Sequence, residues 1–316
     1  MTKVILDAFG GDYAPLEIVR GGVLALKKHK HLHLIFAGDE EKIKEVLATF
    51  DYPADRVEII DAKEIIENDE MPTAALRAKP NSSIARAFNE LRTNDEVVGI
   101  VGAGSTGAML TAAFLKLGRL KGISRPALCP ILPTVNNKQV AIVDCGANMD
   151  AKPINLLHFA VMGSAYLSTV YNVEKPRVAL LNVGVEDHKG NELSKETFEL
   201  LSKETRLNFV GNMEARELLS GNYDVVVADG FAGNILLKGA EGAIISVLRM
   251  IKGEIKKGVI RKVGAVFMRR AFKKLKSKIN YNESGGAVLL GCKKLVVKSH
   301  GNSKAKSICA SIEQAL

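Results

Sequence analysis

Short apolar runs alternate with amphipathic segments of helix length along all 316 residues, and this alternation leaves few fold classes open. Runs that are apolar at every position suit strands buried on both faces, as in a parallel sheet with helices on each side. We therefore expect an α/β fold of three layers, in which a mainly parallel sheet lies between two layers of helices. The expected strands are residues 3–7, 33–37, 57–60, 97–101, 127–132, 140–144, 178–182, 208–210, 225–228 and 296–297.

No proline- or serine-rich linker, low-complexity tract or internal repeat divides the sequence. We expect residues 1–316 to form a single domain, with a helical excursion at about 245–280 within it. No apolar run approaches the ~20 residues that a membrane-spanning helix needs, so no such helix is expected. The N-terminus lacks the basic and apolar regions of a signal peptide, which predicts a cytoplasmic protein.

The net charge of +9 is concentrated in one segment. Residues 252–278 hold eleven basic residues against the single acid Glu254, a net charge of +10, so the rest of the chain is nearly neutral. Apolar residues recur there every three or four positions, which predicts an amphipathic basic helix or helix pair. The apolar stripe is Ile260, Val263, Phe267, Ala271, Leu275 and Ile279.

A basic amphipathic segment can lie on an anionic membrane, dock an acidic protein or remain a solvated surface helix. Nucleic acid is the least favoured partner, because the segment is poor in aromatic residues and the chain has no Trp. The apolar stripe favours a membrane over a protein. The residues expected to contact either partner are Arg261, Lys262, Val263, Phe267, Arg269, Arg270, Lys273 and Leu275.

The clearest motif is a glycine-rich loop that follows the expected strand 97–101 and precedes a helix. Glycines let the backbone approach an anion, and the free amides at the start of the next helix point toward it, so a phosphate-sized ligand is expected. The expected phosphate-binding residues are Gly104, Ser105, Thr106 and Gly107. A dinucleotide is disfavoured, because no acid follows within the residues 97–143 to bind a ribose. A tight turn that needs glycine only for packing is the alternative.

The same loop resembles a nucleophile elbow, which places a serine between a strand and a helix. Ser105, Asp229 and His300 follow one another in the chain order of an α/β-hydrolase triad. The hypothesis of a serine hydrolase or thioesterase is kept open on this basis, although Ala103 stands where an elbow normally has glycine.

Four further strand ends are rich in Gly, Asp and Asn, and the polar turn at His300 follows a fifth strand. Ligands of parallel sheets bind beyond the carboxyl ends of the strands, so these segments are expected to rim one cleft. Amides, carboxamides and a lysine there suit an anionic or acyl ligand. The candidate cleft residues are Asp7, Gly10, Gly11, Asp144, Asn148, Asn182, Lys189, Asp229, Asn234 and His300.

Two candidate sites are rejected. His29, His31 and His33 alternate as on a strand, but neighbouring lysines would repel a metal ion and no carboxylate adjoins them in the sequence. Cys145 adjoins a polar strand end, yet no histidine lies near it in the sequence, so a buried core thiol is favoured over an acyl-carrying nucleophile. The four cysteines have no zinc-ligand spacing and are expected to stay reduced.

Seven motifs run from one end of the chain to the other: DAFGGDYAP, GAGSTGAM, DCGANMDAKP, NVGVEDHKGNE, GNMEAR, DGFAGN and SHGNS. Together they resemble the PlsX family of bacterial phosphate acyltransferases. The resemblance implies a fold like that of phosphotransacetylases and isocitrate dehydrogenases, and no nicotinamide cofactor. No metal is expected either, because phosphate is already nucleophilic near neutral pH. It further implies a homodimer that associates with the cytoplasmic face of the membrane. Many relatives carry Asn at the position of Ser105, so the resemblance does not support a serine nucleophile.

The activity that the resemblance implies is transfer of a fatty acyl group from the thioester of acyl carrier protein to inorganic phosphate. The acyl phosphate would enter phospholipid biosynthesis through a downstream membrane acyltransferase. Phosphate is itself nucleophilic, so the enzyme must hold it beside the carbonyl and stabilise an oxyanion. The motif KGNE places Lys189 as the expected catalytic cation, with Asn182, Asn234 and His300 as further hydrogen-bond donors. A noncatalytic membrane scaffold for acyl carrier protein is a third hypothesis.

Overall fold

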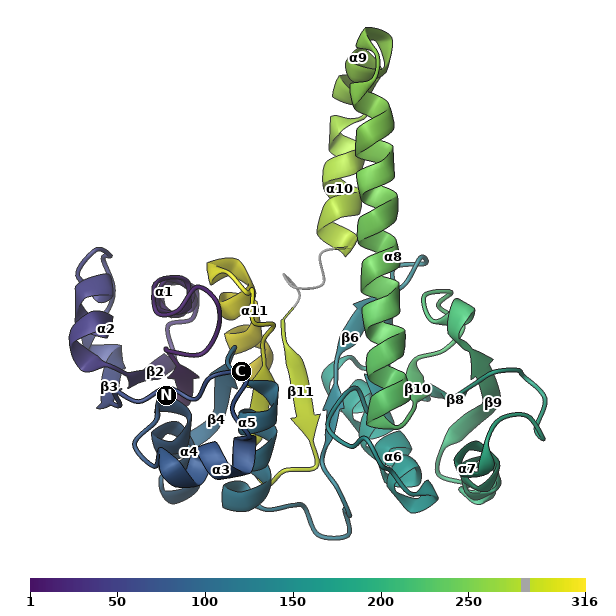
Figure 1. Ribbon diagram of the computed structural model, residues 1–316, viewed down its shortest axis with the longest axis horizontal. Helices are drawn as coiled ribbons and strands as arrows, with labels where there is room; N and C mark the ends of the chain where they lie inside the picture. Colours follow the sequence, from purple (N-terminus) through teal and green to yellow (C-terminus); the bar gives the residue numbers. More distant parts are fainter. Residues whose placement is uncertain (280–284) are drawn as a thin grey trace. The chain divides into compact units, whose positions relative to one another are not determined.

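The computed structural model describes residues 1–279 and 285–316, with side chains up to residue 275 and from residue 285 (Figure 1). Its contacts group into two compact units. Unit 1 comprises Met1–Pro130 and Asn282–Leu316, and unit 2 comprises Ile131–Tyr281. That the whole chain folds as a single domain stays a prediction.

Unit 1 is built on a seven-stranded sheet with the strand order β3-β2-β1-β4-β12-β11-β5. Five neighbouring strands, from β3 to β12, run parallel, and β11 is antiparallel to both of its neighbours. The strands are β1 (Thr2–Asp7), β2 (Leu32–Gly38), β3 (Val57–Asp61), β4 (Val97–Gly102), β5 (Ala127–Cys129), β11 (Ala287–Leu290) and β12 (Leu295–Lys298).

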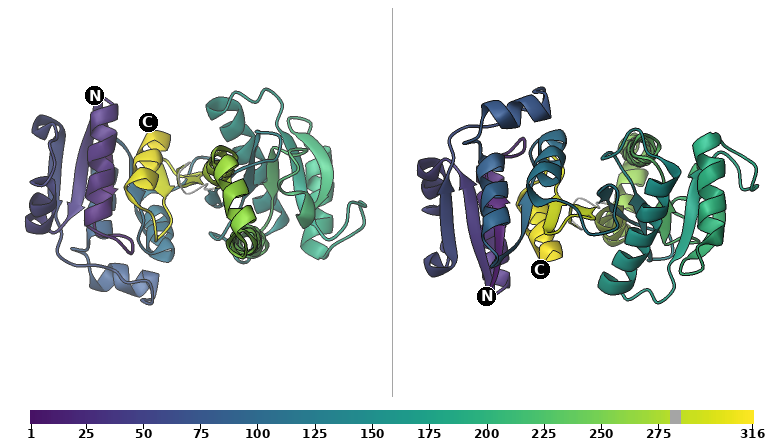
Figure 2. Two further views of the ribbon diagram at one scale, coloured as in Figure 1. Left: turned by 90° about the horizontal axis from the view of Figure 1, so that it is seen from above. Right: turned by 90° about the horizontal axis from the view of Figure 1, so that it is seen from below.

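Helices cover both faces of this sheet, as Figure 2 shows. α1 packs against α11 on one face, and α4 lies across β1 and β4 on the other. The α1 contact needs a glycine, because a Cβ on Gly21 would lie 2.6 Å from the Cβ of Ile308. The helices of unit 1 are α1 (Leu16–Lys28), α2 (Glu40–Leu47), α3 (Pro72–Ala78), α4 (Ser83–Thr93), α5 (Thr106–Ala112) and α11 (Ala305–Ala315), with shorter turns η1 (Ala54–Arg56) and η2 (Ala113–Leu117).

Unit 2 is built on a five-stranded sheet with the order β6-β7-β10-β8-β9, in which only the edge strand β6 is antiparallel. Side chains alternate between its faces: Val226 joins the cluster under α8, whereas Val225 faces Gly163 of α6. The elements are β6 (Ile131–Pro133), β7 (Gln139–Val143), α6 (Pro153–Val170), β8 (Arg177–Asn182), α7 (Glu192–Lys203), β9 (Asn208–Glu214), η3 (Ala215–Glu217), β10 (Val225–Val227), α8 (Gly230–Lys256), α9 (Val259–Phe267) and α10 (Arg269–Ile279).

The α/β class and the mainly parallel pairing of the strands are confirmed, but the strands form two sheets where one was expected. Two strand predictions are also wrong in detail. The segment 127–132 is not one strand, because Pro130 has no N–H to donate and divides it into β5 and β6, which join different sheets. The sequence analysis missed β11 altogether. Its four apolar residues are too few for periodicity to separate strand from helix.

The expected helical excursion is present as the end of α8 followed by α9 and α10 (Figure 1). α9 exposes the apolar side chains of Ile260 and Phe267, 89% and 85% accessible to solvent. α10 returns to the base of α8, where Leu275 lines a pocket with Leu237. Residue 280, the expected end of the excursion, and the side chain of Ile279 lie outside the described residues.

The expectation that no helix could span a membrane is not met by α8. Among the described residues, this one 27-residue helix is long and apolar enough by length and composition alone. Helices of soluble proteins also pass that test. Here Gly230, Gly233 and Leu237 are buried in unit 2, so the first third of α8 is part of the protein core.

The three alternating histidines do not share a strand. His29 caps the end of α1, and β2 starts only at Leu32. Carboxylates do lie beside two of them, contrary to expectation: His29 Nε2 is 3.1 Å from Glu313 Oε1, and His33 Nε2 is 2.9 Å from Glu58 Oε1. Long-range pairing of this kind is invisible in the local sequence.

Asp224, which immediately precedes β10, offers a test of the unit 2 packing. Its carboxylate accepts hydrogen bonds from Nε and Nη2 of Arg177 at 2.9 and 2.8 Å. Burial alone would raise the pKa of Asp224, but the hydrogen bonds from Arg177 outweigh it and hold the pKa below its ordinary value. The pair therefore stabilises the fold above the unfolded-state pKa of ~3.9, and that stabilisation is lost as the pH falls through the lower folded-state pKa.

We expect Asp224→Asn to lower the free energy of unfolding at neutral pH by about 1.5–3 kcal/mol, the usual contribution of hydrogen bonds to a charged group. Urea unfolding at neutral and acidic pH measures it, and the difference from wild type should shrink in acid. The control is Glu199→Gln, which removes an exposed ion pair to Lys203 of 3.8 Å and should change little. An equal loss at all pH values would contradict the role of the carboxylate charge.

Candidate functional site

The carboxyl ends of three adjacent parallel strands form the candidate site of unit 1. In the sheet register, Gly102 of β4 pairs with Asp7 of β1 on one side and with Lys298 of β12 on the other. The loops that leave these three residues therefore start at one level of the sheet. They contain the predicted residues Gly10, Gly104 and His300, so the structure brings together the unit 1 half of the predicted set.

The first two loops touch through glycine. A Cβ on Gly10 would lie 2.6 Å from the backbone N of Gly104, and a Cβ on Gly104 would lie 3.1 Å from the Cα of Gly10. Gly11 has φ +108°, a left-handed conformation that favours glycine. The backbone amide of the next residue, Asp12, donates a hydrogen bond of 2.9 Å to the carbonyl of Gly301. The crossing leaves no room for side chains, so the backbones of the two loops pack directly against each other.

Asp7 and Lys298 place opposite charges beneath these loops. Asp7 is almost fully buried, and burial raises the pKa of its carboxyl above the ordinary value. Hydrogen bonds from Ser83 and from the amide of Phe9, together with the charge of Lys298, act in the opposite direction without reversing it. Nζ of Lys298 also donates to the carbonyl oxygens of Ala103 and Ser299. Asp7 thus acts as a buried anchor for the loops.

Ser105 is the N-cap of α5. Its Oγ accepts a hydrogen bond of 3.4 Å from the amide of Ala108, and the residue is buried. The predicted residues Thr106 and Gly107 belong to the helix itself, which begins two residues earlier than the start at Ala108 expected from the sequence. His300 is exposed, and its Nδ1 lies 3.4 Å from the amide of Asn302. A capping role accounts for Ser105 without any catalytic triad.

In unit 2, Asp144 follows β7 and organises the next loop. It is fully buried and accepts hydrogen bonds from the amides of Cys145, Ala147 and Asn148 at 2.7, 3.0 and 2.6 Å. The side-chain Nδ2 of Asn148 donates to the same carboxylate at 3.0 Å. The predicted residues Asp144 and Asn148 therefore lie together, and their hydrogen bonds hold the loop in place.

Asp229 lies two residues after the adjacent strand β10 and is the N-cap of α8. Its Oδ1 accepts a hydrogen bond of 2.8 Å from the amide of Ala232. Gly230 donates its amide to the carbonyl of Asn148 at 2.8 Å, which joins the two loops. Asn234, one turn into α8, lies beside Gly146 of the first loop, with its Cγ 3.9 Å from where a Cβ would stand.

Asn182 ends β8 and closes the loop that carries Lys189. Its Nδ2 donates to the carbonyl of Lys189 at 3.0 Å, and its Oδ1 accepts from the amide of Val183 at 2.8 Å. Asn212 of β9 adds a hydrogen bond of 2.9 Å to the carbonyl of Glu186. Lys189 itself is 46% exposed, and its Nζ has only a loose ion pair of 4.0 Å with Glu186. The loop thus presents an accessible ammonium group on a fixed backbone.

Cys145 is a core residue, as expected. It is buried, and its Sγ donates to the carbonyl of Gly233 at 3.5 Å. Burial, reinforced by the neighbouring carboxylate of Asp144, raises the pKa of the thiol to about 12. A thiol with this pKa stays protonated at physiological pH, so it is a poor acyl acceptor.

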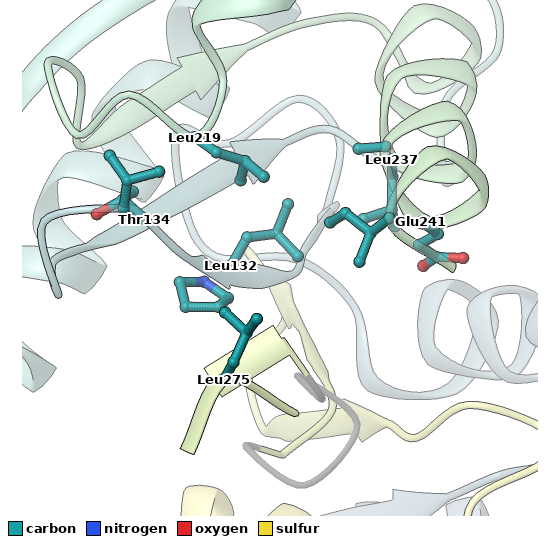
Figure 3. A pocket seen from close by; sticks show the side chains of 10 residues that line it. Leu132, Thr134, Leu219, Leu237, Glu241 and Leu275 are labelled. Atoms are coloured by element: carbon teal, nitrogen blue, oxygen red, sulfur yellow. The ribbon is translucent and has the colours of Figure 1, made fainter. Parts of the chain in front are cut away.

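Two apolar pockets lie among the described residues of unit 2. One, which we call the strand-end pocket, measures about 420 Å³ and lies where β8 and β10 end and α7 and α8 begin. The other, which we call the α8–α10 pocket, measures about 350 Å³ (Figure 3). In Figure 3, Leu132 and Leu219 approach Leu237 of α8, and Leu275 of α10 closes one side. Leu275 thus lines this pocket while remaining 42% exposed.

The sequence analysis missed three residues of these clusters: Lys298, Ser83 and Asn212. Lys298 ends β12, one residue before the predicted turn. The expected strand stopped at residue 297, so the search for polar residues at strand ends did not include Lys298. Ser83 reaches Asp7 from α4, far away in the sequence, and no local pattern marks it. Asn212 lies inside a strand, where strand-end reasoning does not look.

Comparison with known proteins gives a consistent result. The family model described as "Fatty acid synthesis protein" matches residues 2–316. A phosphate acyltransferase from Caldanaerobacter subterraneus is 45% identical over 313 residues, 99% of this chain and 92% of that protein. A phosphate acyltransferase from Bacillus cereus is 44% identical over 312 residues, 99% of this chain and 93% of that protein.

The fold is also found in solved structures. A phosphotransacetylase from Streptococcus pyogenes superposes with a TM-score of 0.60 at 18% identity, and the alignment covers 99% of this chain and 94% of that one. At this level of identity the likeness concerns the fold alone, and it confirms the expected phosphotransacetylase-like architecture.

Proposed function

We propose that this chain, which belongs to the phosphate acyltransferase family of fatty acid synthesis proteins, uses acyl carrier protein as its acyl donor. Membership of the family makes the chain an acyltransferase that transfers an acyl group to phosphate. The finer proposal is that a fatty acyl thioester of acyl carrier protein reacts with inorganic phosphate, and that the acyl phosphate serves phospholipid biosynthesis. The observation that carries it is the identity of 42–45% to proteins of this name over nearly the whole chain.

The loop of Gly104, Ser105, Thr106 and Gly107 is the proposed phosphate site. It is supported by Gly104, which is partly exposed and has no side chain to cover the amides beside it. The amides at the start of α5 add the favourable end of a helix dipole. Lys298, below the loop, contributes positive charge in the same region.

The chemical step needs no nucleophile from the protein. An oxygen of phosphate attacks the thioester carbonyl, the C–S bond breaks, and the sulfur leaves as the thiol of the carrier after protonation. This agrees with the capping role of Ser105 and the raised pKa of Cys145, which leave neither side chain suited to attack. The enzyme instead contributes by holding the reactants together and by stabilising the oxyanion.

Lys189 is the proposed cation for the oxyanion, because its ammonium group is accessible and only loosely paired. Asn182 has both polar atoms engaged within the loop, so we assign it a positioning role for Lys189 in place of the donor role expected from the sequence. Asn234 and His300 remain proposed donors to the carbonyl or to the leaving sulfur. Asp144, Asn148 and Asp229 keep the surrounding loops in place.

The basic segment of α8, α9 and α10 is the proposed contact with an anionic membrane, as a peripheral association of a cytoplasmic homodimer. Ile260, Val263 and Phe267 of α9 are exposed apolar side chains, and Arg261, Lys262, Arg269, Arg270 and Lys273 are exposed beside them. Each basic residue near an anionic surface contributes up to ~1 kcal/mol, and salt weakens this attraction. Acidic acyl carrier protein is the competing partner for the same charges.

The activity test uses full-length protein, a fatty acyl thioester of acyl carrier protein, and phosphate present or omitted. We expect acyl phosphate, trapped as the hydroxamate, only when phosphate is present. Free fatty acid in both conditions would mean a thioesterase, and recovery of the intact thioester in both would mean a noncatalytic scaffold. Either result would refute the proposed donor and reaction.

Two variants separate the proposed phosphate and oxyanion roles. Gly104→Ala should raise KM for phosphate, because the new Cβ would intrude on Gly10, 3.1 Å away. Lys189→Ala should lower kcat about 10²- to 10³-fold, the usual cost of losing one oxyanion donor. Initial rates over a range of phosphate concentrations measure both effects.

Each variant has a matched control. Gly239→Ala adds a methyl group on α8 with no neighbour within 4 Å, and Lys203→Ala removes an exposed lysine from α7. Both controls should keep wild-type constants. A Lys189→Ala protein with wild-type kcat would remove Lys189 from the mechanism.

Membrane contact is tested with Ile260→Glu together with Phe267→Glu. Both side chains are more than four-fifths exposed, so the fold should persist while binding to phosphatidylglycerol-rich vesicles is lost. Flotation with vesicles measures the bound fraction, and Met71→Glu, at an exposed apolar position outside the segment, is the control. Unchanged flotation of the double variant, or binding that ignores ionic strength, would contradict the proposed mode.

A further inference from the structure

The strand-end pocket of unit 2 runs from a buried floor to an exposed rim. Leu156 of α6 and Leu180 of β8 form part of the floor and are almost fully buried. Val183, Phe231 and Ile235 line the same pocket, yet they are 78%, 62% and 57% exposed. Large apolar side chains gathered at the mouth of an apolar cavity indicate a surface that a ligand covers.

The polar side chains of this pocket already have partners within the protein. Asn182 donates to Lys189 and accepts from Val183, as described above. Asn191 accepts hydrogen bonds from the amide and the hydroxyl of Ser194, both at 2.9 Å. Asp229 is the only charged side chain in the lining, and it caps α8.

These properties restrict the occupant. The lining holds no cation, so an anion such as phosphate would be unpaired there. A polar ligand would meet amide and carboxylate groups that are already engaged, whereas a hydrocarbon needs no hydrogen bonds. A volume of about 420 Å³ is within the usual range of ~300–1,000 Å³ for small-molecule pockets.

We infer that the strand-end pocket binds the hydrocarbon chain of the fatty acyl substrate and sets the preferred chain length. This inference rests on the proposed function, since it places the tail of that acyl donor. Gly190 and Asn191, which line the rim, directly follow Lys189 in the chain. When the hydrocarbon chain lies in the pocket, its carbonyl end is therefore at the rim, next to Lys189, the proposed cation for the oxyanion.

The α8–α10 pocket is the competing location for an acyl chain, and α8 borders both pockets. Ala232, in the first turn of α8, lines the strand-end pocket, and Ala240, two turns later, lines the other. Both alanines are partly buried. The same substitution at these two positions therefore fills one pocket or the other.

The experiment compares Ala232→Phe with Ala240→Phe in the full-length protein. We measure kcat/KM with octanoyl and hexadecanoyl thioesters of acyl carrier protein at saturating phosphate. Ala232→Phe should lower the hexadecanoyl-to-octanoyl ratio about tenfold or more, since even one misplaced methylene group alters discrimination by roughly that factor. Ala240→Phe should leave the ratio at its wild-type value.

A ratio that is unchanged in folded Ala232→Phe, or that falls in Ala240→Phe instead, would overturn the inference. Thermal unfolding of each variant confirms that it is folded. If Ala232→Phe does not fold, Ile235→Gln replaces it, because an exposed rim residue tolerates a polar side chain, and a smaller fall in the same ratio is expected.

A binding measurement separates this inference from the proposed function. If wild-type protein makes no acyl phosphate, the proposed function fails, but fluorescence titration with cis-parinaric acid still reports whether a fatty acyl chain binds. Binding that is weakened in Ala232→Phe or Ile235→Gln and retained in Ala240→Phe would support the pocket assignment. No binding to the wild-type protein, or equal binding to all variants, would overturn it.

Discussion

Parallel pairing of β1, β4 and β12 fixes the level at which Asp7, Gly102 and Lys298 end their strands, and the candidate site of unit 1 depends on this register. A slip of one residue would turn the buried carboxylate of Asp7 to the opposite face of the sheet and remove the anchor of its loop. Unit 2 uses the same arrangement, because buried Asp144 follows β7 and gathers the amides of the next loop. In both units a buried carboxylate accepts hydrogen bonds from backbone amides of the loop that follows it.

Much of this architecture could be predicted from the sequence, because buried parallel strands are apolar at every position and their ends are marked by Gly, Asp and Asn. The errors arose where the decisive contact is not local. Pro130 divides one apolar run between two sheets, and the short strand β11 carries too little periodic signal. Leu275 fits the helical stripe of the basic segment, but its place in the α8–α10 pocket depends on how α10 returns to unit 2.

The candidate residues divide in the same way. Asp7 and Lys189 were found because they lie at strand ends, whereas Ser83, which bonds Asp7, and Asn212, which bonds the loop of Lys189, come from other elements. The sequence also could not show that Asn182 has both polar atoms occupied. The pattern of residue types predicted at which strand ends the candidate site residues lie. The hydrogen bonds in the structure then distinguish side chains that are available to a ligand from those that support the backbone.

The loop of Gly104, Ser105, Thr106 and Gly107 contains no side chain that ionises near neutral pH. Its amides therefore present the same electrostatic character at mildly acidic pH as at neutral pH. Any titration seen in its affinity for an anion would originate in the anion itself, or in charged groups outside the loop. Anion binding through backbone amides would therefore depend little on pH. It would also tolerate substitutions of the loop side chains, provided that Gly10 and Gly104 are kept.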